Sequence, residues 1–163
     1  MRRESQRQGQ SGHGRGQRHG RELALRLLSK QARVVGVDRS PDALEETRRL
    51  AGPHADDFAA FTADVSDRSA VDRLPPQILA RCGVVDGVIN NAGIIQPFVR
   101  LQDLDDATIT RVLNVNVFGT LWVVRAFLPL LLERPEAHIV NLSSMGDSCP
   151  RPGRRCNARP RPP

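Results

Sequence analysis

The sequence of 163 residues contains no tyrosine, and its only lysine is Lys30. No phenol is therefore present to act as a general acid or base. The three cysteines, Cys82, Cys149 and Cys156, form no CxxC motif and no spacing typical of a metal site, and their number is odd. This pattern predicts neither a disulfide framework nor a bound metal, and it favours a reducing compartment.

Long apolar runs are also scarce. The N-terminal residues are basic but lack the apolar stretch of a secretory signal. The most apolar run, VFGTLWVVRAFLPLLL, has 16 residues and contains Arg125 and Pro129. We expect this run to be too short and too interrupted to span a bilayer. The sequence therefore predicts a soluble, cytoplasmic protein with no membrane segment.

The formal net charge of +6 is placed unevenly along the chain. Residues 1–20 and residues 147–163 each hold five arginines and one acid, which gives +4 for each end and leaves −2 for the residues between them. A basic protein would normally suggest an acidic partner such as nucleic acid. Here the body of the chain is mildly acidic, and the basic character belongs to the two ends.

Between these ends, segments typical of helices and strands alternate. Leu23, Leu27 and Leu28 share one face of an expected helix at 21–30. In the next helix, at 40–52, Ser40 is the expected cap, with Pro41 at the first position and Gly52 as the stop. Further helices are expected at 67–83, interrupted by Pro75 and Pro76, and at 104–133, and strands at 32–38, 58–65, 84–90 and 137–144. This alternation implies βαβ units and a parallel sheet.

Five local motifs along this pattern occur in an order that resembles one family. They are Gly20 before the first helix, Asp38 at the end of a strand, ADV with Asp64 and Val65, NNAG at Asn90–Gly93, and NVNVFGT with NLSS, which supply Asn116 and Ser144. Over residues 20–146 the chain resembles the classical short-chain dehydrogenases/reductases. The resemblance implies an incomplete, Rossmann-like, doubly wound parallel α/β sheet. It also implies NAD(P)-dependent hydride transfer between a nicotinamide and a small-molecule alcohol or ketone.

Asp38 is the residue that bears on the choice of cofactor. It follows Gly20 by 18 residues, close to the offset of about 20 at which a carboxylate meets the ribose of a dinucleotide. Such a carboxylate repels a 2′-phosphate, so the resemblance favours NAD over NADP, although the neighbouring Arg39 could pair with that phosphate. Asp38 could instead be a turn or cap residue after its strand.

The remaining cofactor residues follow from the resemblance. Asp64 and Val65 match the pair that contacts the adenine ring, although Asp64 could equally form an Asx turn. Asn90 is expected to brace the sheet. Ala92 and Gly93 are small where the backbone passes close to the cofactor.

On the catalytic side, the resemblance implies that Asn116 helps to hold a water that relays protons to the family's lysine. It implies that Ser144 hydrogen-bonds the reacting oxygen of the substrate and polarises it. Two serines after a strand are also typical of a helix cap, and Ser143 is expected to be structural. The family's general acid/base is a tyrosine whose pKa a nearby lysine lowers. That tyrosine would fall near Asn157, where this chain has none.

The N-terminal end departs from the family in a similar way. Gly14 fits the first glycine of the cofactor loop, but Arg18 stands at the second, and no apolar strand precedes them. The family's first strand is central in its sheet. We therefore expect two pairs of strands that face a gap, and the family's C-terminal third is also missing.

These features suggest three segments: an aberrant or disordered segment at 1–19, a partial NAD(P)-binding domain at 20–146, and an aberrant Arg/Pro-rich tail at 147–163. We interpret the ends as products of a shifted reading frame or of a splice or gene-model error. Genuine disordered tails that touch RNA are the alternative. The chain as written is expected to be inactive. The other possibility is a non-catalytic remnant that binds nucleotide or dimerises through the helix at 104–133.

Overall fold

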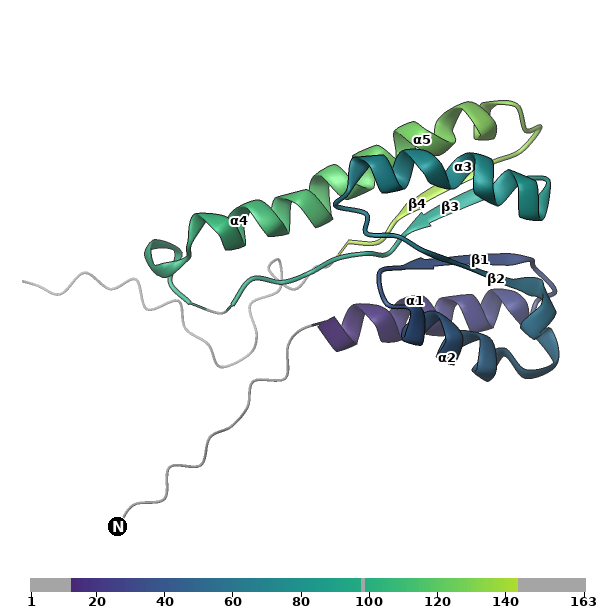
Figure 1. Cartoon of the computed structure of the whole chain (residues 1–163), viewed down its shortest axis with the longest axis horizontal. Coiled ribbons are helices and arrows are strands. Elements are labelled where there is room, and N and C mark those ends of the chain that lie inside the picture. The colour runs from purple at the N-terminus through teal and green to yellow at the C-terminus, as the bar shows by residue number, and fades with distance from the viewer. Residues whose placement is uncertain (1–12, 98, 144–163) are drawn as a thin grey trace, which may run out of the picture.

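The computed structural model describes residues 13–97 and 99–143, and within these ranges helices and parallel strands alternate (Figure 1). The elements are α1 (His13–Leu28), β1 (Val34–Asp38), α2 (Pro41–Ala51), β2 (Phe58–Thr62), α3 (Arg68–Cys82), β3 (Gly87–Asn90), α4 (Asp106–Leu113), α5 (Thr120–Leu132) and β4 (His138–Asn141). Short 3₁₀ helices occupy Gly52–Asp57 and Leu101–Asp103, and a π-helical segment, Asn114–Gly119, joins α4 to α5.

The described strands form two separate parallel pairs rather than one sheet. β1 pairs with β2 in a register that runs from Val34 opposite Phe58 to Asp38 opposite Thr62. β3 pairs with β4, with Asn90 opposite Asn141 at the end of the register. The expectation of two strand pairs that face a gap is therefore confirmed, and the fold is an incomplete Rossmann-like α/β sheet.

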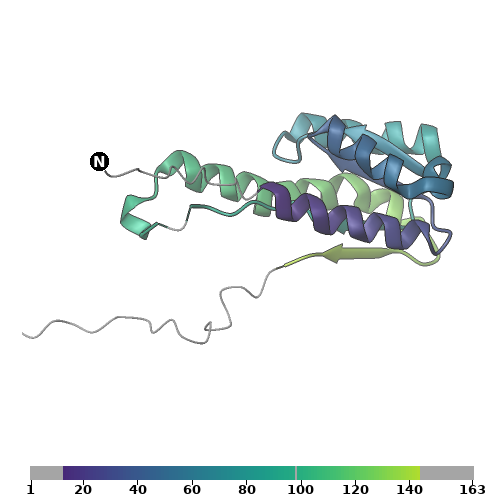
Figure 2. The same ribbon diagram turned by 90° about the horizontal axis from the view of Figure 1, so that it is seen from below.

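Helices cover the first strand pair on both faces. α1 and α2 pack on one face of β1 and β2 around buried Leu28, Leu44 and Phe58. α3 and α5 pack on the other face, and their cluster of buried residues also contacts Val88 of β3, so one helical layer spans both strand pairs. β4 is exposed along its length, and in Figure 2 it forms the outer edge of the ribbon on the side away from α2.

The caps of α2 agree with the sequence. The hydroxyl of Ser40 accepts a hydrogen bond from the backbone N–H of Ala43 at 3.2 Å, and Pro41 opens the helix. Gly52 follows the last helical residue with a φ of 55°, in the region that favours glycine. Both ends of this helix could therefore be predicted from the capping residues in the sequence.

The expected interruption of the third helix is wrong. α3 is continuous from Arg68 to Cys82 with Pro75 and Pro76 inside it. Each proline removes one backbone donor, which normally kinks or ends a helix. The helix nevertheless buries Val71, Leu74 and Ile78 in the core, and packing against α5 outweighs the local penalty.

The N-terminal boundary also differs from the expectation. α1 begins at His13, so residues 13–19 form its first turns instead of preceding it. Once a helix has nucleated, each added residue gains a hydrogen bond, and no proline stands between residues 13 and 28 to stop it. The rest of the predicted aberrant ends, residues 1–12 and 147–163, lies outside the described residues.

The structure corrects the expectation that the most apolar run is too short and too interrupted to span a bilayer. Asp106–Leu132 is one helical run, and by length and composition alone it could cross a membrane. Arg125 and Pro129 lie inside it without breaking it. One such helix is a weak indication, because core helices of soluble proteins and signal sequences have similar length and composition; 17% of the most apolar window of this helix is buried. Here α5 buries Val123, Phe127 and Leu131 against α3 and the strands.

Candidate functional site

The polar residues singled out in the sequence gather where the strands end. Asp38 ends β1, Asp64 follows β2, and Asn90 ends β3. In each strand pair the carboxyl ends lie side by side. In open parallel α/β sheets this is the edge at which ligands bind.

Asp38 is half-buried, and its carboxylate helps to shape the turn into α2. Its Oδ1 accepts a hydrogen bond from the backbone N–H of Ser40 at 2.8 Å. Asp38 therefore acts as a turn residue after its strand, which was the alternative interpretation of its position. A carboxylate has about four acceptor positions on its two oxygens, so the turn bond leaves capacity for the hydroxyls of a ribose.

Asp64 forms the Asx turn that was its alternative interpretation. Its Oδ1 accepts from the backbone N–H of Ser66 at 2.8 Å and from the Ser66 hydroxyl at 2.6 Å. Its backbone carbonyl accepts from the N–H of Asp67 at 3.0 Å. The turn fixes the position of Val65, which packs on the core formed by α3 and α5.

The NNAG turn connects the second strand pair to α1. Asn90 donates from Nδ2 to Oδ1 of Asn141 at 2.8 Å, so it ties the ends of β3 and β4 together, as expected of a bracing residue. Asn91 lies against α1 so closely that a Cβ added at Gly20 would be 2.7 Å from its Nδ2. Ala92 and Gly93 are exposed at the end of this turn.

Asn116 holds the segment after this turn with two hydrogen bonds. Its Nδ2 donates to the carbonyl of Ile94 at 2.9 Å, and its Oδ1 accepts from the backbone N–H of Ile94 at 2.9 Å. Asn116 lies in the π-helical segment, a distortion that occurs frequently at functional sites. The sequence singled out Asn116 for a different role, and this two-bond contact was not predicted.

Gly119 is a second contact that the sequence analysis missed. A Cβ at this position would lie 3.0 Å from Cγ2 of Val65 and 3.1 Å from its carbonyl oxygen. The long helix therefore approaches the backbone after β2 at a point where only glycine fits without a shift. The available signal was a glycine inside an otherwise apolar helix, which often marks close backbone approach.

The site fits the two ends of a dinucleotide unequally. Asp38, Asp64 and Val65, which the resemblance assigns to the adenosine end, lie at or just after the carboxyl ends of β1 and β2. At the pyrophosphate end, Gly14 lies in the first turn of α1 rather than in a glycine loop. Beyond the first turn of a helix the backbone N–H groups are already bonded within the helix, so residues around Gly20 are not free to cradle phosphates.

Two further expectations concern the catalytic role of Ser144 and the presence of a metal site. Ser144 lies outside the described residues. Within residues 13–97 and 99–143, no group of three or more His, Cys, Asp or Glu side chains is placed to hold a metal ion.

Comparison with known proteins agrees with this geometry. The sequence pattern of the short chain dehydrogenase family matches residues 13–156, which begins before Gly20 and ends after Gly146. Fatty acyl-CoA reductase of Acinetobacter baylyi is 32% identical over 130 residues, which are 76% of this chain and 42% of that protein. NADPH-dependent pterin aldehyde reductase of Arabidopsis thaliana is 34% identical over 125 residues, 77% of this chain and 51% of that protein.

Among solved structures, NAD+-bound xylitol dehydrogenase superimposes with a TM-score of 0.77 at 27% sequence identity. The superposition covers 83% of this chain and 52% of that one. The chain therefore spans about half the length of the relatives that it matches.

Proposed function

Because this chain belongs to the short-chain dehydrogenase family, we propose that it carries part of the machinery for hydride transfer between NAD(P) and an alcohol or carbonyl compound. The observation that carries the proposal is the convergence of Asp38, Asp64 and the NNAG turn at the carboxyl ends of the parallel strands. The contact between Asn116 and Ile94 fixes the far side of the same edge.

The residues divide between the two ends of the cofactor and the substrate. Asp38 would receive the ribose hydroxyls, Asp64 and Val65 would contact the adenine, and the backbone at Ala92 and Gly93 would lie beside the dinucleotide. Asn116 and Ser144 belong to the substrate side. A nicotinamide bound there would supply or accept the hydride.

We assign NAD as the preferred cofactor. The names of the relatives include an NADPH-dependent reductase and an NAD+-bound dehydrogenase, so family membership leaves both cofactors open. A carboxylate at the end of β1 repels a 2′-phosphate by its charge. Arg39 is the next residue and is exposed, and its guanidinium reduces this preference.

We propose that the chain as written does not catalyse the reaction. It has no tyrosine, and Lys30 lies in the turn after α1, at the end where β1 begins. That turn is at the opposite end of the strand from Asp38, so Lys30 cannot assist an acid/base at the site. Purified protein of verified mass should show no NAD(P)-linked oxidation or reduction. Turnover on the order of 1 per second, an ordinary value for an enzyme, would refute this.

The composition of the ends supports a proposal about their origin. Residues 1–12 and 147–163 are rich in Arg, Gly, Pro and Gln and contain no Val, Ile, Leu or Phe. We attribute them to a shifted reading frame or to a splice or gene-model error. The coding DNA across both junctions tests this directly. We expect an alternative reading frame there that is open and encodes the family's tyrosine and lysine. The absence of such a frame would overturn the attribution.

A second candidate function, a dimerising remnant, is supported by one surface. Apolar residues form an exposed stripe along the long helix, and we call it the helix stripe: Leu113, Val117, Leu121, Leu128 and Leu132. Their exposed fractions are 39% or more. Exposed apolar residues that recur along one helix are typical of a protein interface. A homo-oligomer formed through this helix would cover it.

A further inference from the structure

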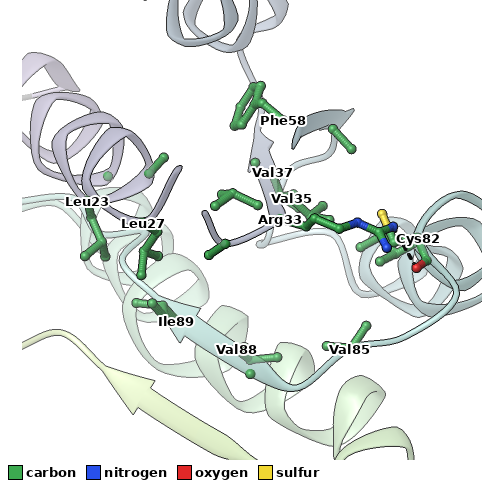
Figure 3. Close-up of a pocket in the computed structure, with 18 of the residues that line it drawn as sticks. Leu23, Leu27, Arg33, Val35, Val37, Phe58, Cys82, Val85, Val88 and Ile89 are labelled. Atoms are coloured by element: carbon green, nitrogen blue, oxygen red, sulfur yellow. Dashed lines mark hydrogen bonds between the residues drawn. The ribbon is translucent and has the colours of Figure 1, made fainter. Parts of the chain in front are cut away.

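A cavity of about 860 Å³ separates the two strand pairs. Val35 and Val37 of β1 line one side of it, and Val88 and Ile89 of β3 line the other. Figure 3 shows these four side chains around the same space, with Leu23 and Leu27 of α1 beside them. We call this cavity the strand slot.

Both long sides of the strand slot are strand edges. β1 is hydrogen-bonded to β2 and β3 to β4, and in the described part of the chain neither β1 nor β3 has a second strand neighbour. Alternate N–H and C=O groups of each strand therefore face the slot without a ladder partner. Backbone groups left unpaired away from water cost free energy comparable to a lost hydrogen bond. An occupant that supplies its own backbone donors and acceptors would satisfy both edges.

The other two walls are helical and apolar. Leu23 and Leu27 of α1 lie on one side, and Val123 and Phe127 of α5 lie on the other. A strand inserted between such layers has both faces buried, so its side chains must be apolar at successive positions rather than at alternate ones. At one end of the slot, Arg33 donates from Nη2 to the carbonyl of Cys82 at 2.8 Å and links the start of β1 to α3 (Figure 3).

The length of the occupant follows from the strands beside it. β1 has five residues and β3 has four, so the slot takes about five residues at a rise of about 3.3 Å each. The segments of this sequence outside the described ranges do not suit it. Residues 1–12 and 144–163 contain no Val, Ile, Leu, Phe or Trp.

We propose that the strand slot binds an extended, continuously apolar strand of about five residues from a separate polypeptide, which pairs with β1 and β3 at once and joins the two strand pairs into one sheet. Recognition comes from main-chain hydrogen bonds along two edges, and selectivity comes from the apolar walls. Asp38, Asn90 and Ala92 of the cofactor site proposed above also line the slot, but strand binding requires no cofactor and is tested without one.

The test uses the full chain and a fluorescent peptide of about six β-branched apolar residues between lysines that keep it soluble. Fluorescence anisotropy should show saturable binding. Two control peptides carry the same end charges: one has a central proline, and the other alternates apolar and charged residues. Each should bind at least about tenfold more weakly, because the first cannot complete the ladders and the second buries charge.

Matched protein variants locate the site. Ile89→Lys places a charge at the slot on a residue that is 39% exposed, and Leu101→Lys makes the same change where the residue is 81% exposed and outside the slot. Ile89→Lys should weaken binding by about tenfold or more, and Leu101→Lys should leave it unchanged. Circular dichroism of both variants shows whether helix content is retained. If Ile89→Lys loses helix content, hydrogen exchange of the unmodified chain locates the site instead. The peptide should then slow amide exchange in β1 and β3.

The proposal is overturned if no saturable binding occurs up to about 1 mM peptide, a concentration that corresponds to only about 4 kcal/mol of binding free energy. It is also overturned if the proline peptide binds equally well, if the two lysine variants weaken binding to the same extent while both keep their helix content, or if exchange in β1 and β3 does not change.

Discussion

Removal of the Asn116 side chain should loosen the segment after the NNAG turn. Asn116 makes two hydrogen bonds of 2.9 Å to the backbone of Ile94, and a typical hydrogen bond contributes about 0.5–1.5 kcal/mol. Because the pair is exposed, we expect about 1–2 kcal/mol for both together. Asn116→Ala should therefore speed hydrogen exchange at the Ile94 amide by roughly 5- to 30-fold.

The control for this change is Asn114→Ala, in the same π-helical segment. Alanine has a higher helix propensity than asparagine by up to about 0.7 kcal/mol. Asn116→Ala and Asn114→Ala gain this propensity equally, so it does not distinguish them. The side chain of Asn114 has no hydrogen-bond partner among the described residues, so this variant should not speed exchange at Ile94. Asn116→Asp keeps the acceptor and loses the donor, and it should fall between the two. Equal exchange at Ile94 in all three variants would refute the account of this contact.

Two other predictions concern the proposed cofactor and the helix stripe. In calorimetric titrations NAD should bind more tightly than NADP, and Asp38→Ala should reduce the difference; tighter binding of NADP to the unmodified chain would reverse the assignment. Light scattering should show a dimer that Leu121→Glu dissociates, whereas Leu101→Glu, outside the stripe, should not; a monomer at all concentrations would rule out the dimerising remnant.

Much of the fold was predictable because its signals are local. Ser40 and Gly52 mark the ends of α2, and apolar runs bounded by turns gave the order of the strands. The split of the sheet followed from the absence of an apolar segment before α1. Asp38, Asp64 and Asn90 lie where parallel strands end, which is a position that local pattern can indicate.

What could not be predicted depends on contacts between distant residues. The continuity of α3 through Pro75 and Pro76 depends on the burial of Leu74 and Ile78 against α5, which outweighs local propensity. The bonds of Asn116 join residues 22 positions apart, and no local pattern indicates them. The close approach of Gly119 to Val65 likewise appears only when the chain has folded.

The central claim is that the described part of this chain is a dehydrogenase sheet divided by an unfilled strand position, and differential scanning calorimetry tests it most directly. The account predicts no cooperative unfolding transition for the chain as written. A variant in which residues 1–19 are replaced by an apolar strand and a glycine loop, and residues 147–163 by a tyrosine-lysine segment with the family's remaining strands, should unfold cooperatively and oxidise an alcohol with NAD. A sharp transition of the unmodified chain, with equal calorimetric and van't Hoff enthalpies, would contradict the claim.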